Sequence, residues 1–138
     1  MVVDDHQIVL TGITSALAGH GELQVVETAS SGEKALELLR SCQPDVILLD
    51  INMPGLGGID TMKRLHNRYP DIKVLGLSMY SRGPYPARFL QAGGAGYITK
   101  DASLEEMTHA IKQVFAGNSY ISPKVATNIV VNNLDSEP

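Results

Sequence analysis

The sequence predicts an α/β fold, a doubly wound five-stranded parallel sheet with five helices packed on its faces. Short apolar runs rich in Val, Ile and Leu alternate with longer segments of helical period, and this strand-then-helix order repeats along the chain. The length of 138 residues and the hydrophobic content of 43% suit one domain. A chain of this size can bury a core without a disulfide or a structural metal.

Five strands are expected, at residues 1–3, 23–28, 46–49, 72–77 and 96–99. The third and fourth are continuous apolar runs, which is typical of parallel strands buried on both faces. The first strand is short, because only three residues precede Asp4.

Helices are expected at residues 6–19, 32–42, 58–69, 86–92 and 103–116. The fifth has the clearest period, since five apolar residues share one face: Leu104, Met107, Ile111, Val114 and Phe115. Ser103 with Glu106, and Ser30 with Glu33, each predict a capping box. Ser122 and Pro123 open a sixth helix over residues 124–131, and the polar residues 132–138 are typical of a linker or a frayed end.

Composition excludes several classes of protein. Eleven basic and fifteen acidic residues give a net charge of −4, which argues against a nucleic-acid surface on this domain. The single Cys42 has no partner in the chain, which fits a reducing compartment. No stretch has the length of a membrane span, and the first residues lack the pattern of a secretion signal. We therefore expect a cytoplasmic protein without membrane contact.

Polar residues follow four of the five predicted strands. Asp4 and Asp5 follow the first, Asp50 the third, Ser78 the fourth and Lys100 the fifth. Ligands bind beyond the carboxyl ends of the strands in an open parallel sheet, so these side chains are expected to meet. Clustered carboxylates need protons or a cation to offset their charge. Mg²⁺ suits this place, because it prefers oxygen ligands and shares phosphate oxygens with the protein.

These groups are those that phosphoryl transfer requires. A phosphoryl group would meet the metal, the Lys100 ammonium and the Ser78 hydroxyl. Asp50 is favoured as the attacking carboxylate, because residues 46–49 hold it at the middle of the sheet, which leaves Asp4 and Asp5 for the metal. The product would be an aspartyl phosphate. The Asn52 backbone carbonyl offers a further oxygen ligand.

This arrangement closely resembles the receiver domain of two-component response regulators, from Val2 to about Tyr120. Four motifs carry the resemblance: residues 4–5, residues 45–50 with 53–55 and Gly58 after them, Ser78, and residues 96–100. Each motif is weak alone, but the four in order are specific. Within this family the chain is most similar to the NarL/FixJ branch and its GacA/UvrY-like group, through residues 4–6, 9–13, 84–86, 90–93, 115–117 and 120–123.

The resemblance implies a CheY-like, flavodoxin-like fold with strand order 2-1-3-4-5. It implies that Asp50 accepts the phosphoryl group. Mg²⁺ is then held by Asp5, by Asp50 and by the backbone carbonyl of Asn52, while Asp4 acts mainly through a metal-bound water.

The resemblance also assigns roles around the phosphoryl group. Ser78 and Lys100 contact it, and Tyr97 is the switch aromatic that is coupled to Ser78. Asn52 and Tyr80 modulate dephosphorylation, because they flank the path of the hydrolytic water, and the bulk of Tyr80 is expected to hinder that water.

The function implied is a signalling switch rather than a conventional enzyme. A sensor histidine kinase donates the phosphoryl group, and the protein catalyses its own phosphoryl transfer and slow dephosphorylation. The face formed by the fourth helix, fifth strand and fifth helix then rearranges and pairs with another copy. Members of this branch bind DNA through a C-terminal helix-turn-helix domain, and this chain stops before one. We expect a regulator truncated at both ends, with a receiver domain at residues 1–120 and a linker helix and polar tail at 121–138.

Two other functions stay open. A haloacid-dehalogenase-like phosphatase also forms an aspartyl phosphate, but it needs a second Asp two residues after the nucleophile, where this chain has Asn52. A pseudo-receiver would bind partners without phosphorylation, although every expected group is present. Considered without the other motifs, Lys100 would be interpreted as a solvated surface charge and Tyr97 as a packed, half-buried ring.

The histidines show no metal-ligand spacing and are assigned to surfaces or helix starts: His6, His20, His66 and His109.

Overall fold

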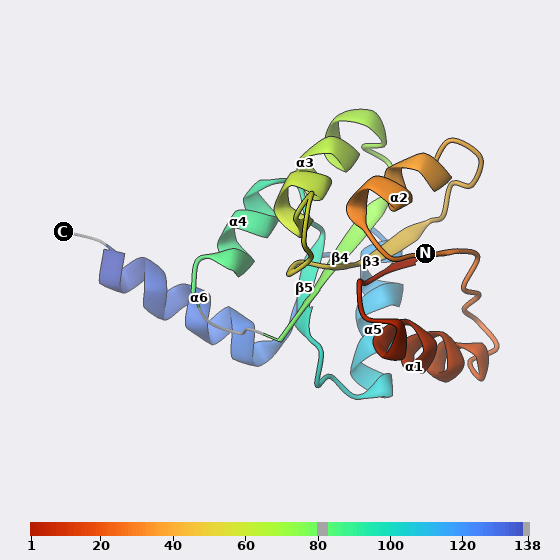
Figure 1. Cartoon of the computed structure of the whole chain (residues 1–138). Coiled ribbons are helices and arrows are strands. Elements are labelled where there is room, and N and C mark those ends of the chain that lie inside the picture. Colours follow the sequence, from red (N-terminus) through yellow and green to blue (C-terminus); the bar gives the residue numbers. More distant parts are fainter. Residues whose placement is uncertain (80–82, 137–138) are drawn as a thin grey trace.

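The computed structural model describes residues 1–79 and 83–136 of the chain. Within these residues six parallel strands form one sheet in the order β2-β1-β3-β4-β5-β6 (Figure 1). The strands are β1 (Val2–Val3), β2 (Thr28–Ala29), β3 (Val46–Asp50), β4 (Lys73–Ser78), β5 (Gly96–Thr99) and β6 (Tyr120–Ile121). The predicted order of the first five strands is confirmed, and β6 is an addition at the edge beside β5.

The helices cover both faces of the sheet, as a doubly wound fold requires (Figure 1). They are α1 (Gln7–Ala18), α2 (Gly32–Leu38), α3 (Gly58–Arg68), α4 (Tyr85–Gln91), α5 (Leu104–Phe115) and α6 (Pro123–Ser136). Successive strand residues point to opposite faces. Leu48 and Leu75 therefore pack in a cluster with residues of α1 and α5, while Ile47 and Val74 pack in another with residues of α2, α3 and α4.

The second strand is shorter than predicted. Residues 23–28 were expected to pair, but β2 covers only Thr28–Ala29. The reason is the length of β1, which offers two residues to pair with. In the described part of the chain, the segment 23–27 joins β1 only through the Glu27 carbonyl, which accepts a hydrogen bond from the Val2 amide at 3.1 Å.

One of the two predicted capping boxes is wrong. Ser103 accepts a hydrogen bond from the Glu106 amide at 3.1 Å, as expected. At α2 the cap is Ser31 rather than Ser30, because the extended backbone of Ser31 aims its hydroxyl at the Lys34 amide, 3.0 Å away. The two ends of the predicted apolar face of α5 are also exposed, Leu104 by 43% and Phe115 by 61%.

The last helix is longer than predicted. It was expected over residues 124–131 with a frayed tail, but α6 continues to Ser136. Once its first turns form, each added residue fixes only its own backbone and gains one hydrogen bond, so polar residues can extend the helix. The preceding β6 pairs with β5 in the register Gly96↔Tyr120. A Cβ at Gly96 would lie 2.2 Å from the Tyr120 carbonyl oxygen, so glycine is required for this contact.

Candidate functional site

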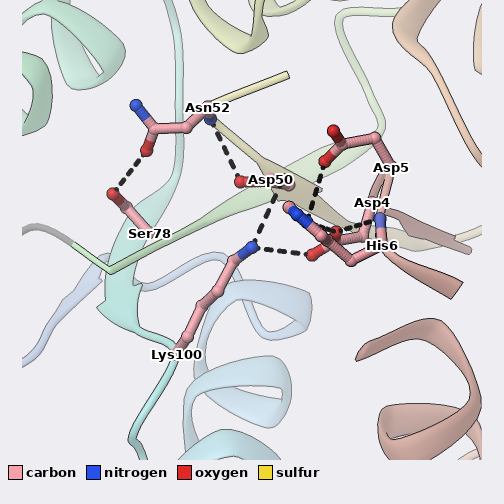
Figure 2. A network of polar contacts seen from close by, with 7 residues as sticks. All are labelled: Asp4, Asp5, His6, Asp50, Asn52, Ser78 and Lys100. Carbon is pink, nitrogen blue, oxygen red and sulfur yellow. Dashed lines mark hydrogen bonds and ion pairs between the residues drawn. The ribbon is translucent and has the colours of Figure 1, made fainter. Parts of the chain in front are cut away.

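The residues predicted at the strand ends come together at one edge of the sheet (Figure 2). Asp4 and Asp5 follow β1, Asp50 and Ser78 end β3 and β4, and Lys100 follows β5. The parallel register brings the ends of these strands level, with Asp50 beside Leu77 and Ser78 beside Thr99 in the ladder. Asp4 and Asp50 are both fully buried, at 0% exposure.

Lys100 joins the two buried carboxylates. Its Nζ lies 2.9 Å from Asp4 Oδ2 and 3.3 Å from Asp50 Oδ2. Burial alone would lower the pKa of Lys100, but the carboxylates of Asp4 and Asp50 outweigh it and raise this pKa above its ordinary value. The ammonium therefore stays charged at neutral pH and offsets part of the negative charge.

Asp50 is the carboxylate whose protonation the site perturbs most clearly. Burial raises its pKa to about 6, and the nearby charge of Asp4 adds to this effect. The Asn52 amide, which donates to Asp50 Oδ1 at 3.0 Å, and the Lys100 ammonium act in the opposite direction. At pH 7 and above Asp50 is mainly ionised, which is the form that a nucleophilic carboxylate needs.

Ser78 connects the site to the interior of the domain. Its hydroxyl donates to Asn52 Oδ1 at 2.9 Å, and its side chain acts to lower the pKa of the Tyr97 hydroxyl. The Tyr97 ring is fully buried and packs edge to face against Phe89, with centroids 6.2 Å apart. Burial of this ring raises the pKa of its hydroxyl. The switch role expected for Tyr97, coupled to Ser78, stays a prediction.

His6 belongs to the site and was missed by sequence reasoning. Its Nδ1 lies 3.1 Å from Asp5 Oδ1 and 3.3 Å from Asp4 Oδ1, and its backbone amide donates to Asp4 Oδ1 at 2.9 Å. The residue does start α1, as expected. Its position directly after Asp4 and Asp5 was the signal that could have indicated this contact. A search for histidines at metal-ligand spacing does not detect a histidine that is adjacent to the acidic residues.

The loop after Asp50 turns sharply back to α3. Gly55 takes a positive φ of 72°, and the Gly58 amide donates to the Ile51 carbonyl at 3.1 Å. A Cβ at Gly58 would lie 2.4 Å from Ile51 Cα and 2.8 Å from the Asp50 carbonyl oxygen. Backbone cannot yield as a side chain does, so only glycine fits here without displacing Asp50.

We expect Gly58→Ala to lower the free energy of unfolding by about 2–4 kcal/mol, because the backbone around Asp50 must shift. Gly57→Ala is the matched control, since a Cβ there meets nothing within 4 Å. It should cost no more than about 1 kcal/mol, the typical effect of a changed N-cap. Urea unfolding measures both, and equal stabilities for the two variants would contradict the steric argument.

The residues present fit a divalent cation. Asp4, Asp5, His6 and Asp50 each offer a ligand atom within 4.8 Å of the others. Three carboxylates against one Lys100 ammonium leave two negative charges at a largely buried site. In the described part of the chain, the Lys100 ammonium is the partner that lies against Oδ2 of Asp4 and Oδ2 of Asp50. Hard oxygen donors with an excess of two charges suit Mg²⁺.

The fold and this acidic strand edge define a CheY-like receiver module. The sequence matches the response regulator receiver domain over residues 1–112, so the chain belongs to that family. It is 48% identical over 137 residues to the response regulator GacA of Pseudomonas aeruginosa and 35% identical over 137 residues to the response regulator UvrY of Escherichia coli. The resemblance to GacA/UvrY-like regulators of the NarL/FixJ branch is confirmed.

These relatives are longer proteins. The alignments cover 99% of this chain in both cases, and 64% of GacA and 63% of UvrY. Among solved structures, a two-component response regulator of the LuxR family from Aurantimonas matches with a TM-score of 0.91 and 29% identity, over 97% of this chain and 96% of that one. Within residues 1–79 and 83–136, no helix is both long and apolar enough to cross a membrane.

Proposed function

We propose that the chain is a phosphoacceptor switch in which Asp50 takes a phosphoryl group from a sensor histidine kinase. The proposal rests on the position of the Lys100 ammonium. It lies between the fully buried carboxylates of Asp4 and Asp50 at the carboxyl edge of the sheet. A partly buried lysine in this position costs desolvation energy, which a purely structural ion pair would rarely repay. Membership of the receiver family supports the same assignment.

In the proposed step, an ionised oxygen of Asp50 attacks the phosphorus of a phosphohistidine. The new bond joins this oxygen to phosphorus, the phosphorus–nitrogen bond breaks, and its electron pair returns to the imidazole, which takes up a proton from solvent. Asp5, Asp50 and the Asn52 carbonyl would hold Mg²⁺, with Asp4 acting through a water. Bound there, the ion would offset charge on the carboxylates and on the phosphoryl oxygens.

Lys100 and Ser78 are proposed to change partners during the transfer. Once Asp50 has become an acyl phosphate its carboxylate loses its own negative charge, and the Lys100 ammonium is free to pair with the phosphoryl oxygens. The Ser78 hydroxyl, which donates to Asn52 in the unphosphorylated protein, would donate to the same oxygens instead. The phosphoryl group adds up to two negative charges, enough to favour both movements.

The wider role is proposed from the relatives. Because the chain matches only part of their length, its output is proposed to pass to a DNA-binding domain outside residues 1–138, with transcription as the regulated process. The proposed partners are the kinase and, after phosphorylation, a second copy of the protein. The proposed location is the cytoplasm, and slow autodephosphorylation would end the signal.

The test is incubation with Mg²⁺ and a small phosphodonor such as acetyl phosphate, followed by intact mass measurement. We expect one added phosphoryl group on the wild type, its loss in EDTA, and none on Asp50→Asn. The matched control is Asp71→Asn, an exposed carboxylate, which should be phosphorylated normally. Phosphate on the Asp50→Asn variant under native conditions would overturn the assignment. Steady turnover of phosphomonoesters would instead favour the phosphatase function.

Tyr80 lies outside the described residues, and its role stays a prediction from the sequence. We expect Tyr80→Ala to shorten the lifetime of the aspartyl phosphate roughly tenfold, because a smaller side chain would admit hydrolytic water. Loss of the phosphoryl group after removal of the donor measures this lifetime. Met79→Ala, one residue earlier, is the control, since Met79 is largely exposed. An unchanged lifetime in Tyr80→Ala would contradict the steric explanation.

A further inference from the structure

Glu33 of α2 contacts the loop at residues 51–57, which follows the proposed phosphoacceptor. Because the cap of α2 is Ser31, Glu33 is the second residue of the helix, whereas a capping box uses the third. Its Oε1 instead accepts a hydrogen bond from the Leu56 amide at 2.7 Å, across 23 residues of sequence. A short bond between an amide and a carboxylate is typical of a charge-assisted contact. The Glu33 side chain therefore joins α2 to the loop between β3 and α3.

Two glycines make room for this contact. Gly32 lets the start of α2 lie directly against α3, because a Cβ there would overlap the Thr61 hydroxyl and lie 3.1 Å from the Leu56 carbonyl oxygen. A Cβ at Gly55 would lie 3.2 Å from Glu33 Oε1 and crowd the carboxylate. The surroundings of Glu33 thus allow its carboxylate to reach the Leu56 amide.

Glu33 is charged in this contact. The Leu56 amide is the main cause that lowers the pKa of Glu33, and the charge of Arg64 on α3 acts in the same direction. The side chain lies at the surface, where water competes for its hydrogen bonds. We therefore expect the contact to matter for the conformation of the loop more than for the stability of the fold.

The loop at residues 51–57 is fixed at both ends by other hydrogen bonds. At its start, the Asn52 amide donates to Asp50 Oδ1 at 3.0 Å. At its end, the Gly58 amide donates to the Ile51 carbonyl oxygen at 3.1 Å. Both contacts are local, so they leave the middle of the loop without support from another part of the domain.

Glu33 supplies that support. Among the backbone amides of residues 53–57, all of them described, only the amide of Leu56 has a hydrogen-bond partner. The Leu56 carbonyl oxygen accepts a long hydrogen bond from the Thr61 hydroxyl, at 3.5 Å. The Met53 side chain is buried, and Leu56 packs against the same apolar cluster. Apolar packing holds the loop on the domain but does not orient its peptide groups, so the bond to Glu33 is needed for that.

We infer that Glu33 is a positioning residue for the proposed metal site. Through the Leu56 amide it orders the loop that carries the Asn52 carbonyl, one of the proposed Mg²⁺ ligands. The inference rests on the proposed function, which assigns this carbonyl to the metal. A loop that is already ordered loses less conformational entropy when the cation binds, so the ordered loop binds the cation more tightly.

Calorimetric titration of the full chain with Mg²⁺ tests this role. Glu33→Ala removes the acceptor, and we expect it to raise the Mg²⁺ dissociation constant about five- to tenfold, near the lower end of the usual effect of an outer contact. Glu33→Gln removes the charge but keeps an oxygen that can accept from the Leu56 amide. We expect it to raise the constant no more than about twofold.

Glu37→Ala is the matched control. Glu37 is an exposed carboxylate on the same helix, and it pairs with Lys34, so its removal should leave Mg²⁺ binding unchanged. Two results overturn the positioning role. One is a dissociation constant for Glu33→Ala equal to that of the wild type. The other is an equal loss of affinity in Glu33→Ala and Glu33→Gln, which would assign the effect to charge rather than to the hydrogen bond.

The rate of mass gain with acetyl phosphate, measured at increasing Mg²⁺ concentrations, separates positioning from general damage to the site. We expect Glu33→Ala to need about five- to tenfold more Mg²⁺ for half of its maximal rate. Its maximal rate should stay within about twofold of the wild type, because Asp50, Ser78 and Lys100 are unchanged. A lowered maximal rate with an unchanged Mg²⁺ requirement overturns the role.

The two levels of the proposal fail differently. If the wild type binds Mg²⁺ but Asp50 takes up no phosphoryl group, the phosphoacceptor function is wrong, and the Mg²⁺ titrations decide the role of Glu33. If the wild type is phosphorylated and Glu33→Ala binds Mg²⁺ as tightly as the wild type does, only the positioning role is wrong.

Discussion

Lys100→Gln is expected to tighten Mg²⁺ binding several-fold and to slow phosphorylation by acetyl phosphate roughly 10²–10³-fold, the usual effect of losing a preorganised donor. The two effects have opposite signs for one reason. The ammonium lies 2.9 Å and 3.3 Å from Asp4 and Asp50, so it neutralises carboxylate charge that a bound cation would otherwise neutralise. During phosphoryl transfer the same ammonium is needed to offset charge on the phosphoryl oxygens.

Calorimetric titration with Mg²⁺ and the rate of mass gain with acetyl phosphate measure the two effects separately. Lys34→Gln is the control, because Lys34 is exposed and pairs only with Glu37 on α2 among the described residues. It should match the wild type in both assays. Weaker Mg²⁺ binding in Lys100→Gln would show that the lysine organises the metal site instead of competing with the ion.

Asp50→Asn is expected to stabilise the metal-free protein at pH 7.5 by about 1–3 kcal/mol. Burial raises the pKa of Asp50 from 3.8 in its ordinary state to about 6 in the folded protein. A raised pKa means that this group favours folding below pH 3.8 and loses that contribution as the pH rises through about 6. At pH 7.5 the folded protein bears the cost of an ionised Asp50, beside Asp4 and only partly offset by Lys100, and asparagine removes it.

Urea unfolding in EDTA at several pH values tests this sign. The gain in the free energy of unfolding should be largest at pH 7.5 and shrink as the pH is lowered to 4.5, because Asp50 is then mostly protonated in the folded protein. Asp71→Asn at an exposed position should change stability by no more than about 0.5 kcal/mol at either pH. A gain for Asp50→Asn that is independent of pH would place its origin in packing rather than in charge.

The position of the site could be predicted because it depends on few assumptions. Each of Asp4, Asp50, Ser78 and Lys100 directly ends or follows an apolar run, and a parallel sheet brings all such positions to one edge. Neither step needs side-chain geometry. The order of the first five strands was predicted from the family resemblance alone, and that order is observed.

The features that could not be predicted from the sequence depend on local backbone and side-chain geometry, or on an element of only two residues. Ser30 and Ser31 both precede α2, and only the extended backbone of Ser31 selects it as the cap. The contacts of His6 require the direction of its ring. The strand β6 has two residues, too few for a periodic signal, and it pairs with β5 because Gly96 admits the Tyr120 carbonyl at close range.

The edge strand β6 also has a consequence for where this receiver domain can be joined to another domain in a chimaera. The boundary expected from the sequence, residue 120, falls inside β6, between Tyr120 and Ile121. A chimaera joined there would separate Tyr97 from the Ser122 amide and remove Val125 from the core. The packed part of the domain extends at least to Ile129, so we expect a fused domain to be tolerated only beyond that residue.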